Sequence, residues 1–142
     1  MNPALIFLPV LAQMLLTLLL YVALQGRKKH AALRGDVDAA RRALDEDAWP
    51  AEVRQVNNNL RNQFELPVLF YVLCLALFAL NATGWLVQGL AWAFVASRVV
   101  HAWVHVHSNV VTVRRRVFIV GVLLVFALWL LLAWRVLAGA LA

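Results

Sequence analysis

Four long apolar runs separated by polar segments dominate the pattern of the chain. They cover approximately residues 4–25, 58–80, 85–107 and 115–137. Each run has the roughly 20 residues that a helix needs to cross the hydrocarbon core of a bilayer. A backbone in lipid must satisfy its own hydrogen bonds, so we expect every run to be helical. The pattern predicts an all-α membrane protein, a four-transmembrane-helix bundle forming a single domain over residues 1–142.

The composition agrees with a chain that is embedded in lipid. It is 64% hydrophobic and 14% charged, whereas soluble domains are roughly 45–50% apolar and about 25% charged. The first run is longer than the apolar part of a signal peptide, and its positive charges follow it, so we expect it to be retained as a span. The formal net charge is +6 and the basic residues flank the apolar runs. Anionic lipid headgroups are therefore expected as partners, and nucleic acid is not.

The distribution of basic residues predicts the orientation of the bundle. Of thirteen lysines and arginines, eight lie within residues 27–61 and three more are residues 114–116. The turn predicted at residues 81–84 contains none. By the positive-inside rule, the connection 27–57 is cytoplasmic and both termini lie on the non-cytoplasmic side.

The long polar connection carries two further predictions. Residues 38–47 could form a short amphipathic helix. From Glu52 onward neither Gly nor Pro interrupts the chain before Pro67. We therefore expect a helical lead-in to the second span, with Pro67 removing one backbone N–H and loosening the helix there.

Polar side chains gather where the second span enters the membrane. Asn62 and Glu65 are three residues apart and share a helix face, with Asn58 and Arg61 on the same side or next to it. Charged groups in a span are costly and usually face a bundle interior or a cavity. The alternative is that Arg61 snorkels and Glu65 ends a helix at the headgroup level.

A second polar group follows one stripe of the third span. Arg98, His101 and His105 are spaced three and four residues apart. The two histidines have the spacing of a metal pair, but the chain has four histidines in all and no second pair on another span, so we expect no metal. The two polar groups together suit a small, multiply charged ligand near the cytoplasmic end. The apolar helix surface beside them would serve a hydrophobic second substrate.

These residues resemble those of the MAPEG family, the membrane-associated proteins in eicosanoid and glutathione metabolism. The resemblance covers nearly the whole chain and is closest to the short bacterial members. Its most specific parts are Arg61, Asn62, Glu65 and Pro67 on the second span, and the stripe of Arg98, His101 and His105 followed by Arg114 and Phe118.

The resemblance implies a homotrimer, here in a bacterial inner membrane, that holds glutathione as co-substrate between subunits near the cytoplasmic side. It assigns the tripeptide's polar groups to Asn62 and Glu65. It assigns stabilisation of the thiolate to Arg114, with Arg115 and Arg116 as alternatives, and we predict that His105 orients or shuttles a proton. The further binding residues that we predict are Arg61, Arg98, His101 and Asn58.

The chain also departs from the family pattern. His101 and His105 stand where relatives commonly have tyrosines, Asn58 stands where an arginine is frequent, and one residue fewer separates Glu65 from Pro67.

The function we predict is a membrane-bound glutathione-dependent transferase or peroxidase acting on hydrophobic electrophiles. The alternative is a non-catalytic lipid-binding or scaffolding membrane protein of the same fold. A transporter is less favoured, because the chain has no internal repeat.

Overall fold

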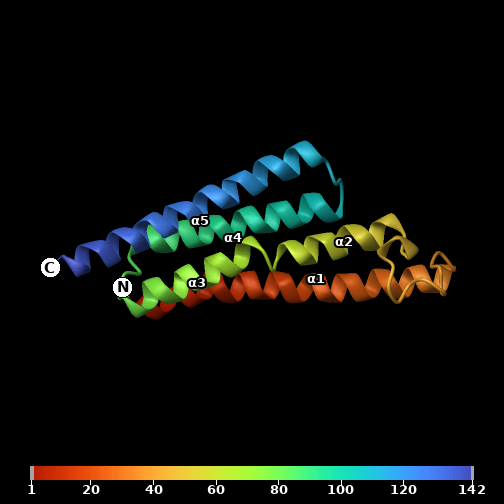
Figure 1. The fold of residues 1–142 in the computed structure, drawn as a ribbon, viewed down its shortest axis with the longest axis horizontal. Coiled ribbons are helices and arrows are strands. Elements are labelled where there is room, and N and C mark those ends of the chain that lie inside the picture. The colour runs from red at the N-terminus through yellow and green to blue at the C-terminus, as the bar shows by residue number, and fades with distance from the viewer. Residues whose placement is uncertain (1, 142) are drawn as a thin grey trace.

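The computed structural model describes residues 2–141 and consists of helices arranged in four rods (Figure 1). The first rod is α1, and α2 and α3 follow one another to form the second. The third and fourth rods are α4 and α5, and the two termini lie at the same end of the bundle. The helix bounds are Phe7–Arg34 for α1, Ala51–Asn62 for α2, Leu66–Ala79 for α3, Trp85–Val106 for α4 and Val111–Ala140 for α5, with 3-10 turns η1 at Pro3–Ile6 and η2 at Glu46–Ala48.

Three segments are long and apolar enough to cross a membrane, namely Pro3–Arg34, Ala51–Ala79 and Val111–Ala140. The remaining long helix, α4, has 22 residues and carries a buried arginine and two buried histidines. These polar residues lower its mean hydropathy without shortening it. The prediction of an all-α, four-helix membrane protein is confirmed.

Two apolar clusters form the core, and a polar band lies between them. The first cluster is centred on Phe70 of α3 and Phe94 of α4, whose ring centroids are 4.4 Å apart. The second joins α1 to α2 around Leu24 and Val56. Along α1, α2 and α4, the residues between the two clusters include buried polar side chains. The members of this polar band are Gln13, Asn59, Gln63, Arg98, His101 and His105.

The second rod is interrupted at residues 63–65. The predicted helical lead-in is present as α2, but α2 ends at Asn62 and α3 begins at Leu66, so the helix is fully interrupted just before Pro67. Pro67 lies in the first turn of α3 and has no N–H to donate to the carbonyl of Gln63. Glu65, just before α3, has φ −104° and ψ −101°, outside the helical region. The break therefore falls within the polar group that the sequence singled out.

The connection between α1 and α2 also differs from its prediction. Residues 38–47 form successive turns and the start of η2 instead of an amphipathic helix. The Asp38 carboxylate accepts hydrogen bonds from the backbone N–H groups of Ala40 and Arg41, at 3.1 and 3.3 Å. Such local bonds compete with helix formation. A hydrogen bond from the backbone N–H of Asp47 is the main reason why the pKa of the Asp45 carboxyl lies below its usual range, and a hydrogen bond from the Arg41 guanidinium lowers that pKa further.

Short connections join α4 to its neighbours at both ends, and the turn predicted at residues 81–84 is present. A tight turn joins α3 to α4, and Asn81 adopts a left-handed conformation there with φ 51°. At the other end, Asn109 has φ 48° and donates its backbone N–H to the carbonyl of Val104 at 2.7 Å. Asparagine tolerates this conformation better than most residues. The second turn fixes where α5 begins, and with it the position of the predicted arginines.

Candidate functional site

A pocket of about 310 Å³ lies where the break between α2 and α3 meets α4 and α5. Side chains from α2, the break, α4 and α5 form its wall. The lining residues are Asn62, Glu65, His101, Val111, Arg114, Arg115 and Phe118. We call this the arginine pocket.

The break supplies the acidic and amide groups of the arginine pocket. Asn62 is the last residue of α2 and is half-buried, whereas Glu65 lies just before α3 and is exposed. Because the helix is interrupted between them, they do not share a regular helix face as the spacing predicted. Both nevertheless line the same pocket. A carboxylate and a carboxamide at one wall can accept hydrogen bonds from an ammonium or amide group.

The α4 stripe supplies buried groups that lack partners. Arg98 is 1% exposed, and one terminal nitrogen donates to the backbone carbonyl of Asn62 at 3.4 Å. Its Nε and its other terminal nitrogen have no partner among residues 2–141, and neither has either ring nitrogen of His101. Leaving buried donors unpaired costs about 1–3 kcal/mol each, more for charged groups. These groups would gain from a ligand that brings hydrogen-bond acceptors.

The first turn of α5 supplies the cationic wall. Arg114 is half-buried and donates from its guanidinium to the side-chain oxygen of Asn109 at 2.8 Å. The left-handed turn at Asn109 therefore anchors Arg114 as well as starting the helix. Arg115 also lines the pocket, whereas Arg116 is exposed and is not among the lining residues. Of the three arginines left open by the sequence, the structure places two at the pocket.

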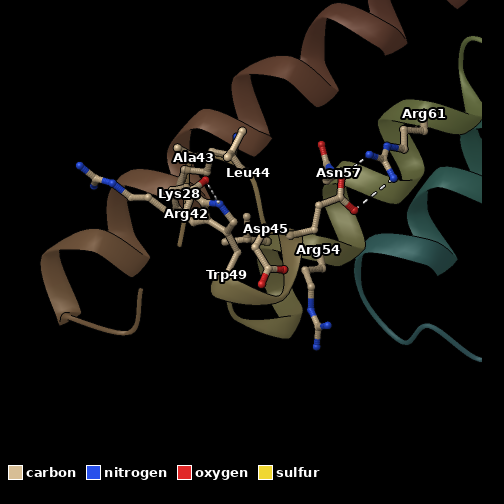
Figure 2. A pocket seen from close by; sticks show the side chains of 11 residues that line it. Lys28, Arg42, Ala43, Leu44, Asp45, Trp49, Arg54, Asn57 and Arg61 are labelled. Carbon is tan, nitrogen blue, oxygen red and sulfur yellow. Dashed lines mark hydrogen bonds and ion pairs between the residues drawn. The ribbon is translucent and has the colours of Figure 1, made fainter. Parts of the chain in front are cut away.

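Four predicted residues lie outside the wall of the arginine pocket, and the first is Arg98, which reaches the break only through its bond to the Asn62 carbonyl. His105 is buried, with its ring centroid 5.7 Å from that of His101, but it is not in the pocket wall. Asn58 is exposed on α2. Arg61 points away and pairs with Glu46 in the connection, as Figure 2 shows.

Figure 2 shows the other polar pocket, of about 290 Å³, in which Arg61 takes part. It lies between the end of α1, the connection and α2. Trp49 donates its ring N–H to the carbonyl of Arg42 there, and the Lys28 ammonium lies 5.1 Å from the centre of the Trp49 ring. The guanidinium groups of Arg42 and Arg54 point away from each other. This arrangement ties the connection to the helices and does not converge on one ligand.

A third, wholly apolar groove of about 410 Å³ runs between α3 and α5. It begins at Leu66, the residue after Glu65, and at Val122, one turn after Phe118. The arginine pocket and this apolar groove therefore follow one another along the same pair of helices. Gly121, between them, lets Leu66 and Ser97 approach, since a Cβ there would lie 3.4 Å from both side chains.

The order of these groups along four membrane-type helices is matched by a family model. The model described as MAPEG family covers residues 5–134. The chain belongs to the MAPEG family. The MAPEG match extends from the start of the first rod to the last turns of α5, and so includes every residue of the arginine pocket. MAPEG proteins include membrane glutathione transferases and peroxidases. A search of curated proteins and a search of solved structures found no match.

The chemical groups of the arginine pocket can be read from its lining residues. Across residues 2–141, no group of three or more histidine, cysteine, aspartate or glutamate side chains is placed to hold a metal ion. The pocket offers two guanidinium groups, one imidazole, one amide and one carboxylate. Sequence reasoning missed the amides of the polar band, Gln13, Asn59 and Gln63. These amides lie inside or beside apolar runs, where an amide without a hydrogen-bond partner is costly, and this position could have marked them.

Proposed function

We propose that this MAPEG protein is a glutathione-dependent transferase or peroxidase acting on hydrophobic electrophiles. The observation that carries the proposal is the arginine pocket, where Asn62 and Glu65 from the break face the arginines that begin α5. Glutathione carries two carboxylates, an ammonium group and a thiol, and the pocket offers opposite or complementary groups for each.

The charges of the pocket suggest how the tripeptide is held. Glu65 takes the ammonium group, and Asn62 binds a peptide group beside it. The unpaired N–H groups of Arg98 and His101 are available for acceptors that reach the buried side of the pocket. Arginine binds carboxylates through two parallel hydrogen bonds, which adds geometric selectivity.

The cationic wall suggests how the thiol becomes reactive. The thiolate is the nucleophile, and a nearby positive charge favours it over the thiol. We assign this role to Arg114, because Asn109 holds its guanidinium in place. The His105 ring centroid lies 5.7 Å from that of His101 and outside the pocket wall, so we assign His105 a role in orienting His101 and not a contact with the ligand. The apolar groove between α3 and α5 would hold the hydrophobic electrophile beside the sulfur.

The chemistry follows from these positions. In a transfer reaction the sulfur forms a bond to the electrophilic carbon, and the leaving group departs with its electron pair. In a peroxidase reaction the sulfur attacks a peroxide oxygen, the O–O bond breaks, and an alcohol leaves as the other oxygen takes a proton. A second glutathione then reduces the sulfenic acid and releases the disulfide and water. Neither route needs a metal.

A direct assay tests the proposed function. Purified protein is expected to conjugate glutathione to a chloronitrobenzene or to reduce a hydrophobic hydroperoxide. Arg116→Ala serves as the control, because Arg116 is exposed and outside the pocket wall; it should retain activity. If the wild-type protein shows neither reaction and calorimetry detects no glutathione binding, the enzymatic proposal fails.

A second candidate function rests on the apolar groove. Its lining residues are entirely apolar and come from α3 and α5. A non-catalytic member of the fold that binds a lipid there would need this groove but not Arg114. Lipid retained through purification, together with no glutathione binding, would favour this candidate.

We also propose an arrangement in the membrane: a homotrimer in a bacterial inner membrane, with the connection 27–57 in the cytoplasm and both termini outside it. The basic residues near the connection and at the start of α5 support this orientation. Reporter fusions at Gly35 and Thr83 should give opposite sidedness, and native mass spectrometry in mild detergent should give trimers. Equal sidedness would overturn the orientation, and monomers alone would overturn the assembly.

A further inference from the structure

The break between α2 and α3 is held by a side chain that does not line the arginine pocket. Of the three residues at the break, Gln63 is 1% exposed, whereas Phe64 and Glu65 are exposed. Gln63 therefore points into the bundle while its neighbours point outward. A buried amide at the point where a helix stops needs partners, and these determine what it can do.

Gln63 finds partners on two different helices. Its side-chain oxygen accepts a hydrogen bond of 2.8 Å from the amide of Gln13, in the middle of α1. Its side-chain nitrogen donates to the backbone and side-chain oxygens of Asn59 on α2, both at 3.3 Å. Asn59 in turn donates to the backbone carbonyl of Ala102 on α4 at 3.2 Å. We call these three residues, Gln13, Gln63 and Asn59, the amide chain.

The amide chain supplies the constraint that the helix itself lacks. Residues 63–65 lie between α2 and α3, and the backbone N–H groups of Gln63 and Phe64 still donate to the carbonyls of Leu60 and Arg61, at 3.0 and 2.9 Å, so these bonds tie the break to the end of α2 alone. Gln13 and Asn59 are 0% exposed, and hydrogen bonds among amides are stronger in such a setting than in water. The chain of bonds therefore fixes the break relative to both α1 and α4.

The same bonds fix the pocket, because its residues are sequence neighbours of the amide chain. Asn62 and Glu65 flank Gln63, and His101 precedes Ala102. Rotation of the break would turn Asn62 and Glu65 away from His101 together. It would also weaken the bond from Arg98 to the backbone carbonyl of Asn62.

We propose that Gln63, held by Gln13 of α1, is a positioning residue for glutathione: it sets Asn62 and Glu65 against α4 without touching the ligand. The inference rests on the proposed function for the identity of the ligand. It assigns to α1, which contributes nothing to the pocket wall, control over the shape of the binding site.

Methionine substitutions test the proposal, because they keep the length of the side chain and remove the amide. In both Gln63→Met and Gln13→Met, the KM for glutathione should rise about tenfold. The reason is that losing one or two buried hydrogen bonds lets the break move, which weakens binding. The kcat should stay within about twofold, because Arg114 is not displaced. Steady-state kinetics at varied glutathione concentration separates the two constants.

Gln88→Met is the matched control. Gln88 is also a buried glutamine, 7% exposed, but it lies near the start of α4 and outside the amide chain. Its KM for glutathione should remain that of the wild type. An equal rise in all three variants would mean that any lost buried amide loosens the bundle, and the positioning role would be overturned.

A double variant and an exchange measurement complete the test. If Gln63 acts through Gln13, the double variant should bind glutathione about as weakly as Gln63→Met alone, because that variant has already lost the bond to Gln13. Independently of glutathione, backbone amides of residues 61–67 should exchange with deuterium faster in Gln13→Met and Gln63→Met, but not in Gln88→Met. Since Gln13 lies on α1, its variant remains informative if Gln63→Met fails to fold.

The outcomes separate the two proposals. Wild-type protein without glutathione binding would end the proposed function, and faster exchange at the break would then still support the positioning of Asn62 and Glu65. Exchange that is unchanged in both variants, or fully additive effects on KM, would overturn the inference while leaving the enzymatic function intact.

Discussion

Arg114→Ala should remove the thiolate signal of bound glutathione at neutral pH and lower kcat/KM by about 30- to 100-fold. A free thiol ionises near pH 8.5, so only a few per cent is thiolate at neutral pH. A guanidinium next to the sulfur shifts that ionisation down by about 1–3 pH units, which makes the thiolate a large fraction or the majority. Part of the gain is offset, because a less basic thiolate is also a weaker nucleophile.

Ultraviolet absorbance of the thiolate measures this effect directly during a pH titration. Arg115→Ala and Arg116→Ala should be titrated beside Arg114→Ala. Arg115 lines the arginine pocket, whereas Arg116 does not, so the structure predicts a partial effect for the former and none for the latter. In the alternative without catalysis, all three arginines only anchor α5 to anionic headgroups. A thiolate signal that is absent from the wild type, or that survives all three substitutions, would decide for that alternative.

Glu65→Gln weakens glutathione binding by about 1–3 kcal/mol, which corresponds to roughly 5- to 150-fold in the dissociation constant. The substitution keeps the volume of the side chain and removes the charge that is proposed to hold the ammonium group. Because Glu65 is exposed and precedes α3 without capping it through its side chain, the fold should tolerate the change. Isothermal titration calorimetry on detergent-purified protein gives the affinity.

Glu46→Gln is the control for this experiment. Glu46 is also an exposed carboxylate, but it pairs with Arg61 and lies in the connection pocket of Figure 2. Its loss should leave glutathione affinity unchanged. Unchanged affinity in a well-folded Glu65→Gln protein would remove Glu65 from the site, and loss of folding would show that the residue serves the break instead.

The helices were predictable because apolar length is a local property of the sequence. The runs at residues 4–25, 85–107 and 115–137 lie inside or almost inside α1, α4 and α5. The ends were less predictable: α1 continues to Arg34, well beyond the apolar run. Its polar last turns are supported by tertiary contacts, among them Arg27, which donates to the backbone carbonyls of Glu52 and Val106. Contacts of this kind have no local signal.

Spacing and resemblance singled out Asn62, Glu65, His101 and Arg114, and the structure brings these four to one pocket, while their roles stay predictions. Spacing alone could not decide which of two residues on the same helix face lines the pocket. His101 and His105 are one helical turn apart, and only the direction of α5 decides that His101 meets the pocket. Arg61 was assigned to the ligand because its partner, Glu46, lies fifteen residues earlier in an irregular segment. The bond between Gln13 and Gln63 spans fifty residues and follows from no short-range rule.

Both ends of the described chain lie at the same end of the bundle (Figure 1). A polypeptide that returns to its starting side can be repeated in tandem: the tail of one copy can be joined to the head of the next by a short linker, with no additional crossing. Several copies could thus be encoded as one chain in which a single pocket carries Arg114→Ala. Such a concatemer would reveal whether neighbouring pockets turn over independently or in alternation.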